Sequence, residues 1–528
     1  MRRLTLALLL AATSLLADDA PVTLRAIPPL AMAAGNVATW RFVLVNRSPL
    51  RQTQVPFEVS VGGLTLVAMP PSCTFAAFTV RCSVDLAPSS ESPELAVTIG
   101  YDRNAPPFGR YVLTGRIATA PFRVETAFAH DILVTTVADS GPGSLRDAIA
   151  QVNAKCGGLG EFGTQPCRIS FAIDGPLPAA GWFTIAPRTA LAPIVAYDVL
   201  VDGGAQSRHT GDTNPSGPEL MLDGHAVTGA NGLELRGDRS EVTDLAIGFF
   251  PQNGIEVLPA PPRRFASYTI ARDYLGVDPS GIAAAPNGWR GLQAAYGFGT
   301  ITDSILSANG RAGAFLLRSG STTIRNNVFG AGADRVTPLG NRASGLLIDV
   351  PLPEGYKSLP VPYRVVVSDN VVAYNAQAGI ALSFESELEI GRNRILLNAG
   401  PAIDFGLNGS GGSRSSPPTI RSARYADGAT TIEGTALRPA RVFLYANGLL
   451  KADGTAEAEE FLGEVPATGG NSSVLGIFTL TVPRDLRGLY INASSTLFTV
   501  GQPPIGCICD VPEQHQLSSE LSAPVRVE

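Results

Sequence analysis

Apolar and polar positions recur along the middle of this chain in a short unit that keeps its shape. The unit reads NGLEL, NGIEV, RGLQA, AGAFL, SGLLI, AGIAL and PAIDF, starting at positions 231, 253, 290, 312, 344, 378 and 401. Glycine usually precedes two apolar residues that have one residue between them. Because side chains alternate along a β-strand, the two apolar residues face one side and the residue between them faces the other. The pattern predicts short strands, each with one buried face and one outward face.

The spacing of these units predicts how the strands are assembled. Gly232 and Gly254 are 22 residues apart, and so are Gly291 and Gly313. A period near 22, with a second strand segment in each repeat, is typical of a three-sided coil that buries its apolar face only when coils stack. We therefore predict a parallel β-helix over residues 131–410. The longer intervals predict inserted loops at roughly 259–289, 331–343 and 351–363.

The regions on either side of the repeats have a different pattern. Short alternating segments begin at 22, 38, 57, 78, 94 and 110, and turn residues separate them, which predicts an immunoglobulin-like β-sandwich over 18–130. A glycine- and serine-rich linker, placed at 411–418, follows the repeats. Alternating strands then resume and predict a second β-sandwich over 419–528. The fold class is all-β, a β-helix flanked by two sandwiches.

One amphipathic helix is predicted where the repeats begin. In SGPGSLRDAIAQVNA, Ser144 and Asp147 have the spacing of a capping box. Leu145, Ala148, Ile149 and Val152 then fall on one helical face. We expect this helix to cover the open end of the first coil, whose strand edges would otherwise be unpaired.

The same segment carries a resemblance to a known family. SGPGSLRDAIAQVNA is followed by ISFAIDG at 169, TIAP at 184, LVDGGAQ at 200, ELMLDG at 219 and NGLELRG at 231. This series resembles the N-terminal region of bacterial secreted right-handed parallel β-helix proteins of the pectate-lyase-like superfamily, over residues 131–410. The resemblance implies a fold and an exported location, because members of the superfamily include lyases, hydrolases and adhesins.

The chain begins with the features of an exported protein. Residues 1–17, MRRLTLALLLAATSLLA, have two arginines, an apolar run and a small residue at the end, which predicts a secretory signal peptide. No later run is long enough to span a bilayer, so no membrane span is expected in the mature chain. We expect a secreted or cell-surface protein, and the periplasm is an alternative.

Six cysteines suit an oxidising compartment. They form three close pairs, which predict local disulfides, and the pairs are Cys73 with Cys82, Cys156 with Cys167, and Cys507 with Cys509. The last pair has one residue between its members, so a disulfide there closes a strained ring and a redox role is the alternative.

Several kinds of partner are not expected. Only three of the 40 basic residues are lysine and no basic block occurs, so nucleic acid is not an expected partner. The four histidines lack metal-ligand spacing, and no cofactor motif occurs, so no metal or cofactor is predicted.

The outward residues of the repeated unit are the candidate functional residues. They form one predicted column: Glu234, Glu256, Gln293, Phe315, Leu347, Ala381 and Asp404. Glu234 and Glu256, on consecutive rungs, are candidate catalytic carboxylates, because retaining glycosidases use two carboxylates ~5 Å apart. The alternative is that both are ordinary solvated residues. Gln293, Phe315, Leu347 and Asp404 are candidate binding residues.

A second predicted column has a structural interpretation. Asn327, Asn370 and Asn393 follow the second strand of successive coils, and we expect their side chains to bond along the stack. Asp244, Arg272 and Asp303 are expected to form a charge ladder beside them.

The sequence favours a non-catalytic protein that binds a polysaccharide or another cell-surface partner through the flank of the β-helix and its inserted loops. The alternative is a polysaccharide lyase or glycoside hydrolase that acts along the same flank. No catalytic constellation stands out, so the sequence does not decide between them.

Overall fold

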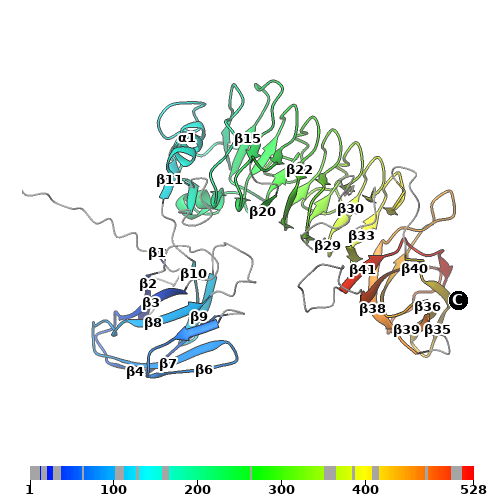
Figure 1. Ribbon diagram of the computed structural model, residues 1–528, viewed down its shortest axis with the longest axis horizontal. Helices are drawn as coiled ribbons and strands as arrows, with labels where there is room; N and C mark the ends of the chain where they lie inside the picture. Colours follow the sequence, from blue (N-terminus) through cyan, green and yellow to red (C-terminus); the bar gives the residue numbers. More distant parts are fainter. Residues whose placement is uncertain are drawn as a thin grey trace, which may run out of the picture. The chain divides into compact units, whose positions relative to one another are not determined.

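The computed structural model describes residues 12–13, 21–27, 37–61, 65–100, 112–125, 130–156, 166–261, 265–349, 364–382, 387–406, 415–469, 474–500 and 514–528 (Figure 1). The chain divides into two compact units. One comprises Met1–Asp131 and Lys155–Cys167, and the other comprises Ile132–Ala154 and Arg168–Glu528. Cys507, Cys509 and the insertion expected at 351–363 lie outside the described residues. So does the predicted signal peptide, apart from Ala12–Thr13.

The N-terminal unit consists of two antiparallel sheets that share one apolar core. One sheet has the order β1 (Ala12–Thr13), β2 (Val22–Ile27), β3 (Val37–Asn46), β8 (Leu95–Gly100) and β5 (Thr65–Ala68). The other has the order β10 (Ala120–Glu125), β9 (Val112–Ile117), β4 (Gln52–Ser60), β7 (Thr79–Leu86) and β6 (Cys73–Ala76). Trp40, Phe42 and Phe57 are fully buried between the sheets. A disulfide joins Cys73 to Cys82 across the paired strands β6 and β7.

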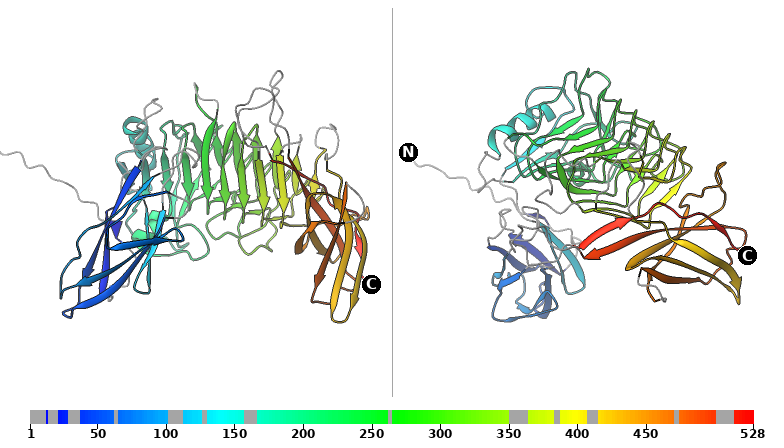
Figure 2. Two further views of the ribbon diagram at one scale, coloured as in Figure 1. Left: turned by 60° about the horizontal axis from the view of Figure 1, so that its bottom comes forward. Right: turned by 45° about the vertical axis from the view of Figure 1, so that its right-hand side comes forward.

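The central region of the second unit is a parallel β-helix with three sheets, whose strands stack side by side in Figure 2. Sheet 1 contains β11 (His130–Val134), β12 (Cys167–Phe171), β14 (Val199–Asp202), β17 (Ser240–Thr243), β20 (Ala266–Ala271), β23 (Gly297–Thr302), β26 (Thr322–Arg325), β29 (Arg364–Ser368) and β32 (Glu387–Gly391). Sheet 2 contains β13 (Phe183–Ile185), β15 (Leu220–Asp223), β18 (Ala246–Gly248), β21 (Tyr274–Leu275), β24 (Ile305–Leu306), β27 (Val328–Phe329), β30 (Val371–Ala373) and β33 (Arg394–Leu396). Sheet 3 contains β16 (Leu233–Leu235), β19 (Ile255–Val257), β22 (Leu292–Ala295), β25 (Ala314–Leu317), β28 (Leu346–Asp349), β31 (Ile380–Leu382) and β34 (Ile403–Asp404).

Side chains at equivalent positions of successive coils fill the interior of the β-helix. The register of sheet 1 stacks Val242, Ile270, Ile301, Ile324, Val367 and Ile390 on one another. Every one of these side chains is β-branched and buried. Such side chains pack well on a pleated strand, and stacking lets each coil bury an apolar face that it cannot bury alone.

A helix covers the first coil. α1 (Leu145–Lys155) buries Leu145, Ala148, Ile149 and Val152. Its Asn153 side chain accepts hydrogen bonds from the backbone N–H groups of Val195 and Ala196, at 2.9 and 3.3 Å. A disulfide between Cys156 and Cys167 closes the segment that follows α1. A second short helix, α2, spans Gly204–Thr210. Within the described ranges no helix is long and apolar enough to span a membrane.

Two antiparallel sheets follow the last coil. One contains β35 (Thr419–Ala426), β36 (Ala429–Leu437) and β39 (Leu475–Val482). The other contains β38 (Glu460–Ala467), β37 (Ala440–Asn447), β40 (Tyr490–Val500) and β41 (Gln514–Ser518), with β42 (Val525–Arg526) also paired to β40. Ile432, Val442 and Phe478 belong to the apolar core that these sheets share. We refer to this region as the C-terminal sandwich.

The C-terminal sandwich bonds to the open edge of the last coil. Ile395 and Ala458 exchange two backbone hydrogen bonds of 2.8 and 2.9 Å. The Ser518 hydroxyl accepts a hydrogen bond from the Ile390 N–H and donates one to the Leu388 carbonyl, both at 2.9 Å. The Glu457 carboxylate accepts from the N–H of Asn398 at 3.2 Å. These groups take the place of the hydrogen-bond donors and acceptors that the backbone of a further coil would provide.

Loops cover the outer face of sheet 2. The outward residues Ile305, Val328 and Val371 lie on neighbouring strands and are buried against Val277 and Ala331. Val277 and Ala331 belong to loops that are closed by the bridges Val277–Ala284 and Ala331–Pro338. More than half of the insertion expected at 259–289 belongs to a regular turn of the β-helix, because it contains the strands β20 and β21. The inserted loop itself begins only after Leu275. The insertion expected at 331–343 is a loop.

Candidate functional site

The structure stacks the repeated unit in the register that the sequence alignment uses. The pairs Glu234–Glu256, Glu256–Gln293, Gln293–Phe315, Phe315–Leu347, Leu347–Ala381 and Ala381–Asp404 lie opposite each other on adjacent strands of sheet 3. The outward column is therefore continuous. Its surroundings change along the stack, however, so the seven positions are not equivalent.

An arginine links the two candidate catalytic carboxylates. One nitrogen of Arg236, Nη2, donates to Glu234 Oε2 and to Glu256 Oε2, at 2.8 Å in both cases. The two oxygens therefore lie within twice that distance of each other, which is compatible with the ~5 Å separation in retaining glycosidases. Asn231 Nδ2 also donates to Glu234 Oε1 at 2.9 Å. Both carboxylates are thus engaged in an ion-paired cluster.

Burial affects one carboxylate of this cluster strongly. The Glu256 side chain is only 13 % exposed, and its burial raises its pKa, while the nearby Arg236 opposes that increase. Glu234 adds to the increase because it carries a like charge. The cluster is therefore sensitive to the loss of its arginine.

The polar contacts continue onto the next two rungs. Gln293 Nε2 donates to Glu256 Oε1 at 3.1 Å, and Arg290 Nη1 donates to Gln293 Oε1 at 2.6 Å. The Arg290 guanidinium also lies over the Phe315 ring, 4.5 Å from its centroid. Burial lowers the pKa of Arg290 to about 10, and the neighbouring Arg311 contributes to this shift. Arg290 Nε makes no hydrogen bond to a described residue.

The corner next to Arg290 presents an arginine and a tryptophan. The Arg311 guanidinium lies over the Trp289 ring, 5.2 Å from its centroid, and Trp289 is 38 % exposed. Neither Arg290 nor Arg311 forms an ion pair with any described residue. We call Glu234, Arg236, Glu256, Gln293, Arg290, Arg311, Trp289 and Phe315 the flank site.

The sequence alignment missed four of these residues. Arg236 follows a repeated unit by one position. Arg290 is the first residue of a unit, and Trp289 and Arg311 each stand one position before a unit. None of the four is therefore the outward residue between the two apolar positions. Trp289 and Arg311 are one repeat of 22 residues apart. That spacing is the signal that would have placed them side by side at one corner.

The other predicted binding residues lie farther along the column. Phe315 is 9 % exposed and Ala381 is fully buried although both point outward. Asp404, on the last strand, accepts a hydrogen bond from the Gly406 N–H at 2.8 Å. The flank site occupies the first four rungs of sheet 3, so Leu347 lies on the rung after it, opposite Phe315, and Asp404 lies on the last rung.

The predicted asparagine column forms a hydrogen-bonded ladder at the corner between sheets 1 and 2. Asn327 Nδ2 donates to Asn370 Oδ1 at 3.0 Å, and Asn370 Nδ2 donates to Asn393 Oδ1 at 2.9 Å. The residue before each rung has a positive φ, for example 56° at Asn326 and 60° at Asp369. This conformation costs ~1 kcal/mol or more for a residue other than glycine. The ladder stabilises it by bonding the corner backbone.

An aspartate occupies one rung of this ladder. Asp273 is fully buried and its Oδ1 accepts a hydrogen bond from the Leu245 N–H at 2.9 Å, while Oδ2 has no partner among the described residues. Burial raises the pKa of Asp273 well above its usual value. Beside it, Arg272 donates to both oxygens of Asp244 at 2.7 Å, whereas Asp303 accepts from the Thr302 hydroxyl.

A second asparagine ladder lies at the corner between sheets 2 and 3, and sequence reasoning did not identify it. Its rungs are Asn287, Asn309, Asn341, Asn375 and Asn398, each bonded side chain to side chain with the next. The first four stand four residues before the glycine of a repeated unit. Glu457 takes the place of a sixth rung, because it accepts from the N–H of Asn398.

Metal binding has no support in the described part of the chain, where no three His, Cys, Asp or Glu side chains converge as ligands would. The chemistry that the flank site offers is recognition by guanidinium groups, an exposed aromatic ring and a partly exposed pair of carboxylates.

Comparisons with known proteins support the fold. The family model described as "Right handed beta helix region" matches residues 290–438. A search of curated proteins finds no match. Among solved structures, the chain is similar to the A-module of mannuronan C-5 epimerase AlgE4 from Azotobacter vinelandii, with 15 % identity, 52 % of this chain and 73 % of that chain covered, and a TM-score of 0.34. It is also similar to tailspike protein 2 of Escherichia coli O157:H7 bacteriophage CAB120, with 10 % identity, 77 % and 70 % covered, and a TM-score of 0.23. The chain therefore contains a right-handed parallel β-helix, and these likenesses concern the fold alone.

Proposed function

We propose that this protein is an exported, non-catalytic binding protein that holds an acidic polysaccharide on the flank site. The observation that carries the proposal is the pair Arg290 and Arg311. Each guanidinium lies against an aromatic ring, and neither forms a direct ion pair with a described carboxylate, although Glu256 lies near enough to Arg290 to attract it. Two neighbouring arginines without a direct ion pair to a described residue are a local concentration of positive charge in a chain whose net charge is −6.

The chemistry of these side chains fits a carboxylate or sulfate group on a sugar. A guanidinium presents a planar set of donors that matches such groups in a bidentate manner. Stacking on Phe315 and Trp289 restricts both arginines, so less side-chain freedom is lost on binding. The exposed face of Trp289 offers apolar contact to the C–H face of a sugar ring.

Export is part of the proposal. Residues 1–17 have the pattern of a signal peptide, and two disulfides, Cys73–Cys82 and Cys156–Cys167, suit an oxidising compartment. We propose a secreted or cell-surface location, where polysaccharides are available as partners. The periplasm satisfies the same requirements.

A glycan array that includes polyuronates, sulfated glycans and neutral glycans tests the proposal. We expect the wild type to retain acidic polysaccharides, more weakly at high salt, because screening weakens charge interactions at exposed sites. The double variant Arg290→Ala/Arg311→Ala should lose at least about tenfold in affinity. Arg335→Ala is the matched control, because Arg335 lies in the loop over sheet 2. Equal binding by the double variant and the control would refute the proposal.

A second candidate function is a lyase or hydrolase at the same place. Burial lowers the pKa of Arg290 to about 10, which moves this side chain toward the range of a general base. The two carboxylates bonded to Arg236 are the alternative acid and base. Assays for new reducing ends and for unsaturated sugar products separate these activities from binding. Product that disappears in Arg290→Ala or Glu256→Gln would make the protein an enzyme.

A further inference from the structure

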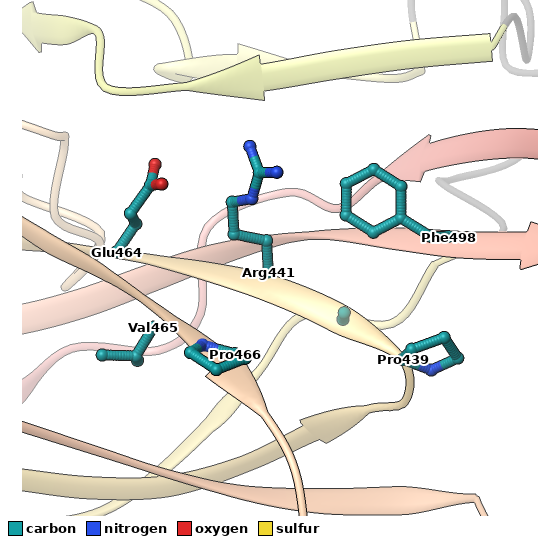
Figure 3. Close-up of a pocket in the computed structure, with 7 residues that line it drawn as sticks. Pro439, Arg441, Glu464, Val465, Pro466 and Phe498 are labelled. Carbon is teal, nitrogen blue, oxygen red and sulfur yellow. The ribbon is translucent and has the colours of Figure 1, made fainter.

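A cavity of about 270 Å³ opens on the C-terminal sandwich, far along the chain from the flank site. Pro439, Ala440 and Arg441 from the start of β37 line it, together with Phe498 of β40. Glu464, Val465 and Pro466 of β38 complete the wall. Figure 3 shows the side chains of Glu464, Arg441 and Phe498 side by side, extending to the same side of these strands.

Arg441 is held in place before any ligand arrives. Its Nη1 donates to Glu389 of β32 at 3.2 Å, and its guanidinium carbon lies 5.3 Å from the centroid of the Phe498 ring. A guanidinium has five N–H donors, and Glu389 takes only part of them. The rest are available to a group in the cavity.

Glu464, unlike Arg441, has a side chain that no described neighbouring group holds in place. The Glu464 side chain forms no hydrogen bond or ion pair with any described residue, and it is exposed on the wall of the cavity. Register places it on β38 opposite Phe443, two positions from the residue paired with Arg441. The cavity therefore has a fixed donor on one side and a free double acceptor on the other.

These walls select the charge and shape of a ligand. Glu464 repels an anion, and Arg441 repels a cation, so a neutral polar molecule fits best. Pro439, Pro466, Val465 and Phe498 give the remaining surface an apolar character suited to a C–H face. The volume is just below the ~300–1,000 Å³ of pockets for drug-sized ligands, which favours a compact ring.

We propose that this cavity binds one neutral pyranose unit. The Glu464 carboxylate accepts hydrogen bonds from two neighbouring hydroxyls, Arg441 donates to a third oxygen, and the ring face packs on Phe498 and the prolines. The C-terminal sandwich is thereby a second sugar-binding site, independent of the acidic ligand proposed for the flank site. Because Arg441 also pairs with Glu389, this site lies at the junction that docks the sandwich on the last coil.

Saturation-transfer NMR on the full-length protein tests this site, with methyl glucoside, methyl galactoside, methyl mannoside and N-acetylglucosamine as probes. We expect at least one probe to bind, and Glu464→Gln and Phe498→Ala each to weaken it by about tenfold or more. Glu433→Gln, an exposed carboxylate of the same sandwich, is the matched control. A thermal midpoint equal to that of the wild type shows that each variant is folded.

Variants of the flank site distinguish binding at that site from binding in the cavity. Arg290→Ala/Arg311→Ala should leave binding of the neutral probe unchanged. The cavity proposal is overturned if no neutral probe binds, if Glu464→Gln binds as tightly as Glu433→Gln, or if methyl glucuronide binds more tightly than the neutral probes. Failure of the acidic-polysaccharide array would leave these results standing.

Discussion

Sheets 2 and 3 belong to the same coils, yet the outer face of sheet 2 is apolar and the outer face of the first rungs of sheet 3 is polar. On sheet 2 the outward residues Ile305, Val328 and Val371 are apolar and lie beneath loops. On the first rungs of sheet 3 the outward residues are Glu234, Glu256 and Gln293, joined by arginines. One face is an additional core, and the other is a polar surface.

This difference indicates that the inserted loops pack on the apolar outer face of sheet 2. We expected function in the outward column and in the insertions alike. The loops that begin after Leu275 and Phe329 instead bury Val277 and Ala331 against sheet 2. An apolar outward face of a β-helix requires such a cover, because exposed apolar patches of this size promote association. The described loops therefore contribute to packing over sheet 2, whereas the flank site lies on sheet 3.

The largest effect on stability is expected from a charged residue placed between the loops and sheet 2. Ile305→Asp puts an uncompensated carboxylate in the small core over sheet 2, and we expect the free energy of unfolding to fall by about 4 kcal/mol. Gln293→Ala, an outward residue on sheet 3, is the matched control and should cost less than ~1 kcal/mol. Urea denaturation followed by circular dichroism measures both. A loss below ~1 kcal/mol for Ile305→Asp would mean that the loops do not cover the face.

The next largest effect should come from the arginine of the flank site. Arg236→Ala leaves the carboxylates of Glu234 and Glu256 without their cation, and we expect a loss of about 2 kcal/mol near neutral pH. Without Arg236, the pKa of Glu256 in the folded protein rises further above its unfolded value. Stability is then greatest when Glu256 is protonated and falls as the pH rises through that raised pKa. Thermal midpoints between pH 4 and 8 should show a deficit that grows with pH, and a pH-independent deficit would contradict this account.

A smaller effect of opposite sign is expected at Asp273. Asp273→Asn supplies an amide that can donate to the backbone, as Asn327 Nδ2 donates to the Ile301 carbonyl, and we expect a gain of about 1 kcal/mol near neutral pH. The raised pKa of Asp273 means that the wild type loses stability as the pH rises above the unfolded value near 4. The gain should therefore vanish at low pH. If this side of the coil is architecture alone, glycan binding will not change.

The smallest effect on stability should accompany a large effect on binding. Trp289→Ala removes an exposed ring, so we expect the free energy of unfolding to change by no more than ~0.5 kcal/mol. Affinity for the acidic polysaccharide should fall by about tenfold, because aromatic contact to the sugar is lost. Calorimetric titration beside thermal denaturation measures both quantities. A variant that loses stability but keeps its affinity would place the binding surface elsewhere.

The sequence predicted the parts of this fold that repeat. The glycine and the apolar pair of each unit fix its register, so the neighbours of Glu256 and Gln293 could be named in advance. The sequence did not predict the roles of Arg236, Arg290 and Arg311, because a long side chain reaches across rungs in directions that strand alternation does not define. The ladder from Asn287 to Asn398 was missed for another reason. Inserted loops change its distance along the chain, so it is regular only relative to the following glycine.

The two ends of the β-helix have a consequence for how such a protein can change its length. Asn153 at one end, and Glu457 and Ser518 at the other, bond to backbone groups of the neighbouring coil. A duplicated or deleted coil of about 22 residues would present the same backbone edge to both ends. Each added coil would lengthen the flank by ~4.8 Å without any redesign of the ends. The number of coils therefore sets the length of the flank, independently of the two structures that cover its ends.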